Sequence, residues 1–172
     1  GTSMASPFLT GTAALAIQAH PSWKPAAIKA ALMNSGDPNA VSDYRTRRLG
    51  AGLINAAAAV GTQAYAFADR DEITLNFGLD EFRDDLHLNR VLHIKNESSA
   101  SMTFNVAATN PQGSPHSISF DATAVTVAPH GQRTVNLTFV LPAATAGDSS
   151  DFRDAAGVIT FTPASSSTNR GI

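Results

Sequence analysis

The sequence of 172 residues contains no cysteine at all. This absence excludes a disulfide framework, a thiol nucleophile and a thiolate metal site, but it does not exclude secretion. Long apolar runs are lacking as well, because the apolar stretch 13–19 is broken by Gln18 and followed by His20. A stretch of this length is too short to cross a membrane. The sequence therefore predicts neither a disulfide scaffold nor a membrane span.

An excess of charge of one sign is also missing. Twelve lysine and arginine residues stand against fourteen aspartate and glutamate residues, giving a formal net charge of −2. Surfaces that bind nucleic acid normally carry a basic excess, so this balance argues against nucleic acid as a main partner. We interpret the cluster Arg45, Arg47 and Arg48 as part of a solvated loop. With 43% apolar residues, the composition is that of a globular protein of one or two domains.

The chain has neither an initiator methionine nor a signal peptide. It begins directly in a turn of small residues that precedes a long apolar run. We therefore expect the sequence to be a fragment, or a processed piece, of a longer protein.

That turn, Gly1-Thr2-Ser3-Met4-Ala5-Ser6-Pro7, places a serine where a helix is expected to begin. Free backbone N–H groups and the positive end of the helix dipole favour both an attacking oxygen and a developing oxyanion there. The alternative is that Ser3 only caps the helix. A cap does not account for Gly1, Met4 or Pro7, and position 6 lacks the Glu or Gln of a capping box. We therefore predict that Ser3 is a catalytic nucleophile.

The turn resembles the serine motif of the subtilisin-like proteases, the subtilase family, which reads Gly-Thr-Ser-Met-Ala or Ser, any residue, Pro. The resemblance implies that Ser3 attacks the peptide carbonyl and that its backbone N–H also donates to the oxyanion. Phe8 replaces the histidine most common after the proline, at a position outside the family's catalytic triad. An α/β-hydrolase fits poorly, because its nucleophile turn requires a second glycine where this chain has Ala5.

Residues 1 to about 64 are alanine-rich and helical in pattern. Apolar residues surround most of the first helix, which predicts a buried helix rather than an amphipathic surface one. Gly11 costs about 1 kcal/mol relative to alanine in a helix interior, and the resemblance favours close backbone packing there. We predict a second helix that opens at Pro25 and ends at Gly36 and Pro38. We interpret Trp23, just ahead of it, as a packing residue, with a substrate-stacking role as the lesser alternative.

The run of residues 50–59 resembles the C-terminal end of a subtilase catalytic domain, where a glycine-flanked turn leads into a short last helix. Asn55 is the predicted N-cap of this helix. The alternative is simply a glycine turn before a helix. The order and distance of the run after Ser3 strengthen both matches.

From about Ile73 the hydrophobic period changes from near 3.6 to 2, which predicts half-buried strands. The alternating segments are residues 73–77, 86–94, 102–108, 118–120, 125–127, 135–141 and 159–161. Seven short strands over roughly a hundred residues suggest an antiparallel β-sandwich. This half looks like the fibronectin type III-like domain that follows the catalytic domain in many larger subtilases.

The predicted fold class is therefore α helices from the C-terminal part of a subtilisin-like α/β catalytic domain, followed by an antiparallel β-sandwich that is fibronectin type III-like. We place the catalytic part at residues 1–65 and the sandwich at residues 66–172. The sandwich is expected to lack its last strand.

Serine needs a hydrogen-bonded general base that a carboxylate orients. In subtilases the chain order is Asp, His, Ser, so the resemblance puts both partners, and the asparagine of the oxyanion hole, upstream of Gly1. All five histidines lie downstream of Ser3, and we interpret each as a solvated surface residue: His20, His87, His93, His116 and His130. We therefore predict that this chain alone does not hydrolyse peptides.

Weaker signals lie in the second half. Asn96-Glu97-Ser98 and Asn136-Leu137-Thr138 match the N-glycosylation pattern, which is common by chance. The acidic residues of segment 80–85 suggest a calcium site, but their spacing matches no loop motif and a solvated acidic turn is the preferred interpretation. No cofactor is evident, and by resemblance a structural calcium would belong to the missing catalytic part.

The predicted function is that of a fragment of a secreted or cell-surface serine endopeptidase. Its partners would be a polypeptide substrate and the remainder of the catalytic domain. The alternative is a non-catalytic β-sandwich module for binding or adhesion, attached to a degenerate protease remnant. The aspartate, histidine and asparagine upstream of Gly1 would decide between the two.

Overall fold

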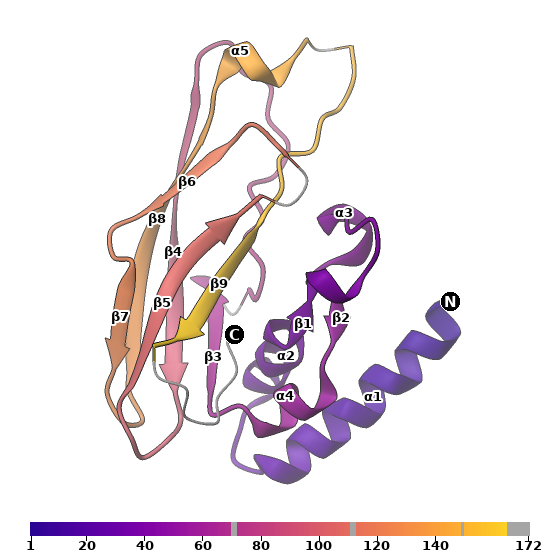
Figure 1. Cartoon of the computed structure of the whole chain (residues 1–172), viewed down its shortest axis with the longest axis vertical. Coiled ribbons are helices and arrows are strands. Elements are labelled where there is room, and N and C mark those ends of the chain that lie inside the picture. Colours follow the sequence, from indigo (N-terminus) through magenta and orange to yellow (C-terminus); the bar gives the residue numbers. More distant parts are fainter. Residues whose placement is uncertain (70–71, 111–112, 149, 165–172) are drawn as a thin grey trace.

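The structure is a computed structural model that describes residues 1–69, 72–110, 113–148 and 150–164. Helices gather at one side of an elongated β body (Figure 1). In chain order the helical side holds α1 (Thr2–Ala19), α2 (Pro25–Asn34), the 3₁₀ turn η1 (Pro38–Ala40), α3 (Thr46–Leu49) and α4 (Ala56–Gly61). Strands β1 (Gly36–Asp37) and β2 (Leu53–Ile54) form a two-stranded antiparallel sheet beside them.

Two helix starts follow the expected local chemistry. Pro25 occupies the first turn of α2, where its missing N–H leaves no intrahelical bond unmade. Asn55 caps α4, because its side-chain oxygen accepts from the backbone N–H of Ala58 at 3.0 Å. Both predictions are confirmed. A small core joins α1, α2 and α4, and it consists of Ala16, Ile28, Leu32 and Ala59.

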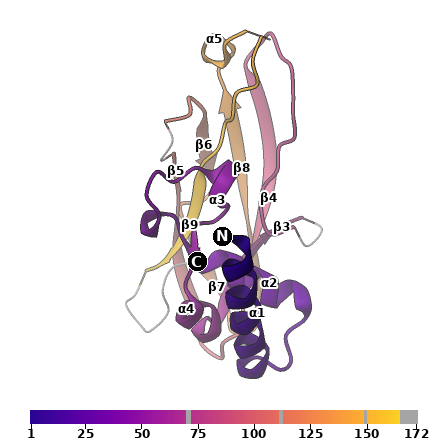
Figure 2. The same ribbon diagram turned by 90° about the vertical axis from the view of Figure 1, so that its right-hand side faces the viewer.

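The burial predicted for α1 is wrong for this chain. Within α1 only Thr12 and Ala16 are buried, whereas Met4 is 76% and Phe8 54% exposed. Figure 2 looks at the molecule from the side of α1, which lies in front of α2 and α4. These two helices cover one side of α1 and leave its other apolar sides open. The close packing expected at Gly11 is also not found, since no other described element comes within 4 Å of the position that a Cβ would take there.

A close approach of backbones requires glycine beside the β1–β2 pair. Gly52 has a φ of +102°, and a Cβ there would lie 2.4 Å from the carbonyl of Asp37. The cluster of three arginines precedes and enters α3 rather than forming a loop, although its side chains are exposed as predicted. Arg47 pairs with Asp154 at 3.2 Å, so a contact links this helix to the segment before the last strand.

Two antiparallel sheets make up the β body, which we term the sandwich. One sheet has the order β3 (Ala64–Ala68), β4 (Leu86–Asn96), β8 (Gln132–Leu141) and β6 (Ser117–Phe120). The other has the order β7 (Ala124–Val127), β5 (Met102–Thr109) and β9 (Val158–Pro163). A short helix, α5 (Ala143–Ala146), follows β8. The predicted antiparallel strands are thus confirmed for six of the seven segments, each of which contains or overlaps a strand.

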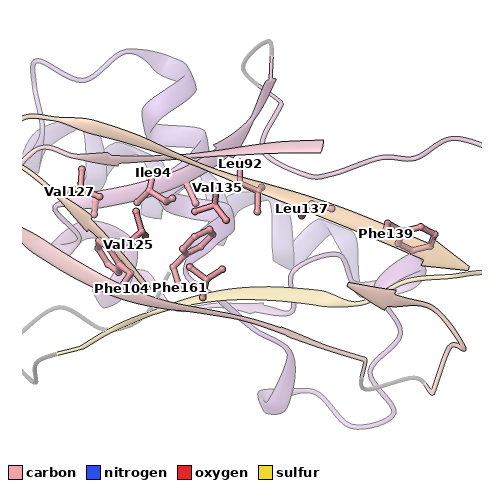
Figure 3. Close-up of a cluster of buried hydrophobic side chains, with 12 residues drawn as sticks. Leu92, Ile94, Phe104, Val125, Val127, Val135, Leu137, Phe139 and Phe161 are labelled. Atoms are coloured by element: carbon pink, nitrogen blue, oxygen red, sulfur yellow. The ribbon is translucent and has the colours of Figure 1, made fainter. Parts of the chain in front are cut away.

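One core lies between the two sheets. Phe104, Val125 and Phe161 from one sheet meet Leu92, Ile94 and Val135 from the other (Figure 3). Alternate residues of β4, β5, β7 and β8 are buried, as a strand with one covered face requires. Each fully buried Phe or Val side chain contributes about 1.5–3 kcal/mol of hydrophobic stabilisation.

The strand predicted at residues 73–77 is wrong. That segment has no regular structure, although Leu75 and Phe77 pack against the core and Phe77 stacks on Phe139 at 4.7 Å. The alternating apolar residues of this segment contact the sheet through their side chains, but its backbone pairs with no strand that the structure describes. In its place β3 pairs with β4 through residues 64–68. This strand spans the boundary expected at residue 65, and the division into two domains stays a prediction.

The outer edge of β3 meets the helices. Strand β3 stands at the end of its sheet, and contacts between α2 and β3 join the helical side to the sandwich. At this edge the side-chain oxygen of Asn34, the last residue of α2, accepts from the backbone N–H of Ala66 at 2.8 Å. The side chain of Asn34 thus accepts a hydrogen bond that a further strand would otherwise accept.

Candidate functional site

Ser3 lies in the first turn of α1 and is exposed. The N-cap of the helix is Gly1, and no side-chain hydrogen bond caps it. Met4 and Ala5 both donate their backbone N–H groups to the carbonyl of Gly1, at 3.0 and 3.2 Å. The interpretation of Ser3 as a mere cap is therefore wrong, because Ser3 already lies inside the helix and its hydroxyl caps nothing.

The environment of Ser3 is open on the described part of the chain. No hydrogen bond joins the Ser3 hydroxyl to any residue that the structure describes. Pro7, four residues on, has no N–H to donate to the Ser3 carbonyl. The backbone N–H groups of Thr2 and Ser3 precede these bonds and have no intrahelical acceptor, and the helix dipole makes this end positive. An oxyanion formed at Ser3 would be stabilised by this end of α1.

Two of the five histidines hold structure together, contrary to the prediction that all are solvated. His20 lies 2.8 Å through Nε2 from the carbonyl of Val60 and stacks on Trp23. His93 lies on β4, and its Nε2 is 2.9 Å from a carboxylate oxygen of Asp69. Neither contact involves Ser3, so neither ring is placed to act as its base.

The other three histidines differ in burial. His87 and His130 are exposed, as predicted, on a strand and in a turn. His116 is half-buried, stacks on Phe139 with ring centroids 4.9 Å apart, and has Nδ1 2.8 Å from the hydroxyl of Ser114. Burial lowers the pKa of His116, because the imidazolium would lose hydration there. The prediction of a solvated His116 is therefore wrong.

Asn96 is the residue whose role the sequence analysis missed. It is fully buried at the end of β4, which excludes it as a glycosylation site in the folded chain. Its Nδ2 donates to the carbonyls of Ala100, Val127 and Ala128 at 2.7, 3.2 and 3.1 Å. Its Oδ1 accepts from the backbone N–H of Ser98 at 2.9 Å. One side chain thus joins the β4–β5 turn to the end of β7.

The acidic segment 80–85 does not gather into a metal site. Among the described residues, no three or more His, Asp or Glu side chains lie where they could hold a metal ion. Asp85 instead accepts from the backbone N–H of Ala143 at 2.9 Å, which fixes the start of α5. Across the same described ranges, no helix is both long and apolar enough to cross a membrane.

Five rings form a continuous row along the outer face of β3 and its neighbours. We name His20, Trp23, Tyr65, Phe67 and His93 the aromatic row. Successive ring centroids are 3.9, 5.3, 5.9 and 5.0 Å apart. Tyr65 and Phe67 alternate with the buried alanines of β3, and this Ala-Tyr-Ala-Phe-Ala alternation was the available signal.

The comparisons with known proteins agree with the motif at Ser3. Residues 1–52 match the family model described as the subtilase family of peptidases S8. The subtilisin-like protease SBT2.5 of Arabidopsis thaliana is 41% identical over 75 residues, which cover 44% of this chain and 7% of that protein. The subtilisin-like protease SBT3 of Solanum lycopersicum is 53% identical over 38 residues, covering 22% of this chain and 5% of that protein. The first part of the chain is therefore homologous to subtilisin-like proteases.

The chain spans less than a tenth of the length of these relatives. Among solved structures, a FixG-related protein from Vibrio parahaemolyticus overlaps with a TM-score of 0.38 and 12% identity. That overlap covers 63% of this chain and 86% of the other. A likeness of this degree carries no functional argument.

Proposed function

We propose that this chain is the C-terminal part of a secreted subtilisin-like serine endopeptidase, with Ser3 as the nucleophile. The observation that carries the proposal is the position of Ser3: the Gly-Thr-Ser motif of the homologous segment opens α1, and the serine is exposed in its first turn. The small fraction of each relative that the chain covers supports its origin in a longer protein.

In the full-length protein, a histidine upstream of Gly1 would take the proton from the Ser3 hydroxyl, and an upstream aspartate would orient the ring of that histidine. The Ser3 oxygen then attacks the scissile carbonyl, the amine leaves with the proton, and water hydrolyses the acyl-enzyme. The backbone N–H of Ser3 and an upstream asparagine side chain would stabilise the oxyanion. The isolated chain is inactive in this scheme, because none of the described histidine contacts reaches Ser3.

The remainder of the catalytic domain would cover the open apolar sides of α1. Met4, Phe8 and Ile17 are all more than half exposed, and a helix apolar around most of its circumference is stable when it is surrounded. The sandwich would be the fibronectin type III-like domain that follows the catalytic domain. Its contact with α2 through β3 supports a role in packing against the catalytic domain.

The test is labelling of the full-length protein with a fluorophosphonate, which reacts with activated serines. We expect labelling and peptide hydrolysis in the wild type, and loss of both in Ser3→Ala, with kcat falling by about 10⁶-fold. Ser6→Ala, in the same helical turn, is the matched control and keeps activity. The isolated chain is expected to remain unlabelled.

Two outcomes would contradict the proposal. Absence of labelling in the folded full-length protein would favour the alternative, a non-catalytic binding module beside a degenerate protease remnant. Labelling of the isolated chain that disappears in Ser3→Ala would refute its inactivity.

A further inference from the structure

A cleft of about 310 Å³ opens between the start of α2 and the outer face of β3. Trp23, Tyr65 and Phe67, from the middle of the aromatic row, line it, together with the polar residues Ser22, Lys24 and Glu97. It lies at the far end of α1 from Ser3, roughly 25 Å along the helix at 1.5 Å per residue. The cleft is therefore separate from the proposed catalytic serine.

The aromatic side of the cleft is rigidly supported. Trp23 stacks on His20 behind it with an interplanar angle of 13°, and Phe67 stacks on His93 at 22°. The rings of Trp23, Tyr65 and Phe67 contact one another in series at interplanar angles of 59° and 37°, so they form a curved wall along one side of the cleft. A wall of preorganised rings presents apolar area at a small entropic cost of binding. Each ring of the wall can take one flat apolar face of a ligand.

The polar residues of the cleft determine which hydrogen-bonding groups a ligand must carry. Lys24 carries a positive charge and Glu97 a negative one, so their formal charges cancel within the cleft. Lys24 donates hydrogen bonds, Glu97 accepts them and the Ser22 hydroxyl does both. Such a set does not select an anion or a cation, but it can satisfy a ligand that carries several hydroxyl groups. Tyr65 already donates its hydroxyl to Glu97 at 3.3 Å, which orients that carboxylate.

We propose that this cleft binds a neutral saccharide. A sugar ring lies with its apolar face against one of the wall rings Trp23, Tyr65 and Phe67, and its hydroxyl groups bond to Ser22, Lys24 and Glu97. The volume is near the lower end of the range for ligand pockets, about 300–1,000 Å³, which suits one ring of a longer chain. The inference goes beyond the proposed peptidase activity and does not depend on it.

Trp23 is the single tryptophan of the chain, so intrinsic fluorescence reports on this cleft directly. We would titrate the chain with hexasaccharides of glucose, of mannose and of N-acetylglucosamine, and with a glycopeptide that carries an N-linked glycan. Hexaarginine and hexaglutamate serve as charged probes. A saturable change with at least one neutral saccharide is expected, and none with either charged peptide. Comparison of the free sugars with the glycopeptide identifies the source of the ligand.

Variants assign the response to the wall. Tyr65→Ala is expected to weaken binding about tenfold, which corresponds to about 1.4 kcal/mol, and Tyr65→Phe to retain most of it. Phe152→Ala is the matched control, since Phe152 is 86% exposed and lies outside the cleft. Glu97→Gln preserves the wall and the fold while altering the polar side, so it tests the site even if Tyr65→Ala fails to fold.

The proposal is overturned if no neutral saccharide gives a saturable response, or if hexaarginine or hexaglutamate alone does. It is also overturned if Phe152→Ala weakens binding as much as the cleft variants do. Because Ser3→Ala leaves the cleft intact, saccharide binding by that variant separates failure of this inference from failure of the proposed peptidase function.

Discussion

Helix α1 and the sandwich are both rich in apolar side chains, but they use them differently. In the sandwich, Phe104 and Phe161 are buried between two sheets of the same chain. In α1, Phe8 and Ile17 are more than half exposed, because α2 and α4 cover only one side. Apolar pattern therefore specifies which surface needs a partner, while only the folded chain reveals whether that partner is present.

The largest expected effect comes from a matched pair of phenylalanine variants. Phe104→Ala leaves a cavity between the sheets and should lower the free energy of unfolding by about 3–5 kcal/mol. Phe8→Ala, on the exposed side of α1, should change it by less than about 0.5 kcal/mol. Urea denaturation of the two variants and the wild type measures both changes. Equal losses would mean that α1 is packed in solution and that the contrast between the two regions is wrong.

An intermediate effect is expected at the asparagine that anchors the sandwich. Asn96→Ala removes three hydrogen bonds that a fully buried amide donates to the carbonyls of Ala100, Val127 and Ala128, and should cost about 1–3 kcal/mol. Asn136→Ala is the control, because Asn136 is exposed and pairs with Asp121 at the surface. Thermal unfolding followed by circular dichroism measures the difference. If both variants unfold alike, the buried hydrogen bonds of Asn96 are not important for the sandwich.

The smallest effect should be a pH dependence confined to the sandwich. Because burial lowers the pKa of His116, the unfolded chain binds this proton more readily than the folded one. The folded chain therefore has its full stability above the pKa that His116 has in the unfolded chain, near 6.5. It loses part of that stability as the pH falls from there through the lower pKa that His116 has in the folded chain. His116→Gln should flatten this part of the stability curve between pH 7 and pH 5. The exposed His87 provides a control, and His87→Gln should leave the slope unchanged.

Much of the fold follows from local chemistry in the sequence. Pro25 and Asn55 mark helix starts that depend on a missing donor and on one capping oxygen, so short stretches are enough to predict them. The strands with alternating large apolar residues were also predictable, because the alternation is a pattern within a short stretch of sequence. The family resemblance of the first segment rested on seven residues around Ser3 and on the run of residues 50–59, and the match of residues 1–52 to the subtilase family supports it.

The errors occurred where the partner of a residue lies far away in the sequence. Strand β3 was missed because its inward residues are alanines, which are typical of helices and concealed their alternation with Tyr65 and Phe67. The segment around Leu75 has the alternation of a strand but no neighbouring backbone to pair with. The aromatic row could not be predicted, since it joins His20 and Trp23 to residues of β3 and β4 through tertiary contacts.

The bond between Asn34 and Ala66 has a consequence for aggregation. An uncovered terminal strand offers its amides to strands of other molecules, which is how sheet proteins aggregate through their edges. Because the last side chain of α2 occupies the amide of Ala66, docking of a foreign strand at this edge is blocked as long as α2 stays folded. Helix α2 thus covers this edge of the sandwich. Unfolding of α2 alone would free the amide of Ala66 to pair with a strand of another molecule.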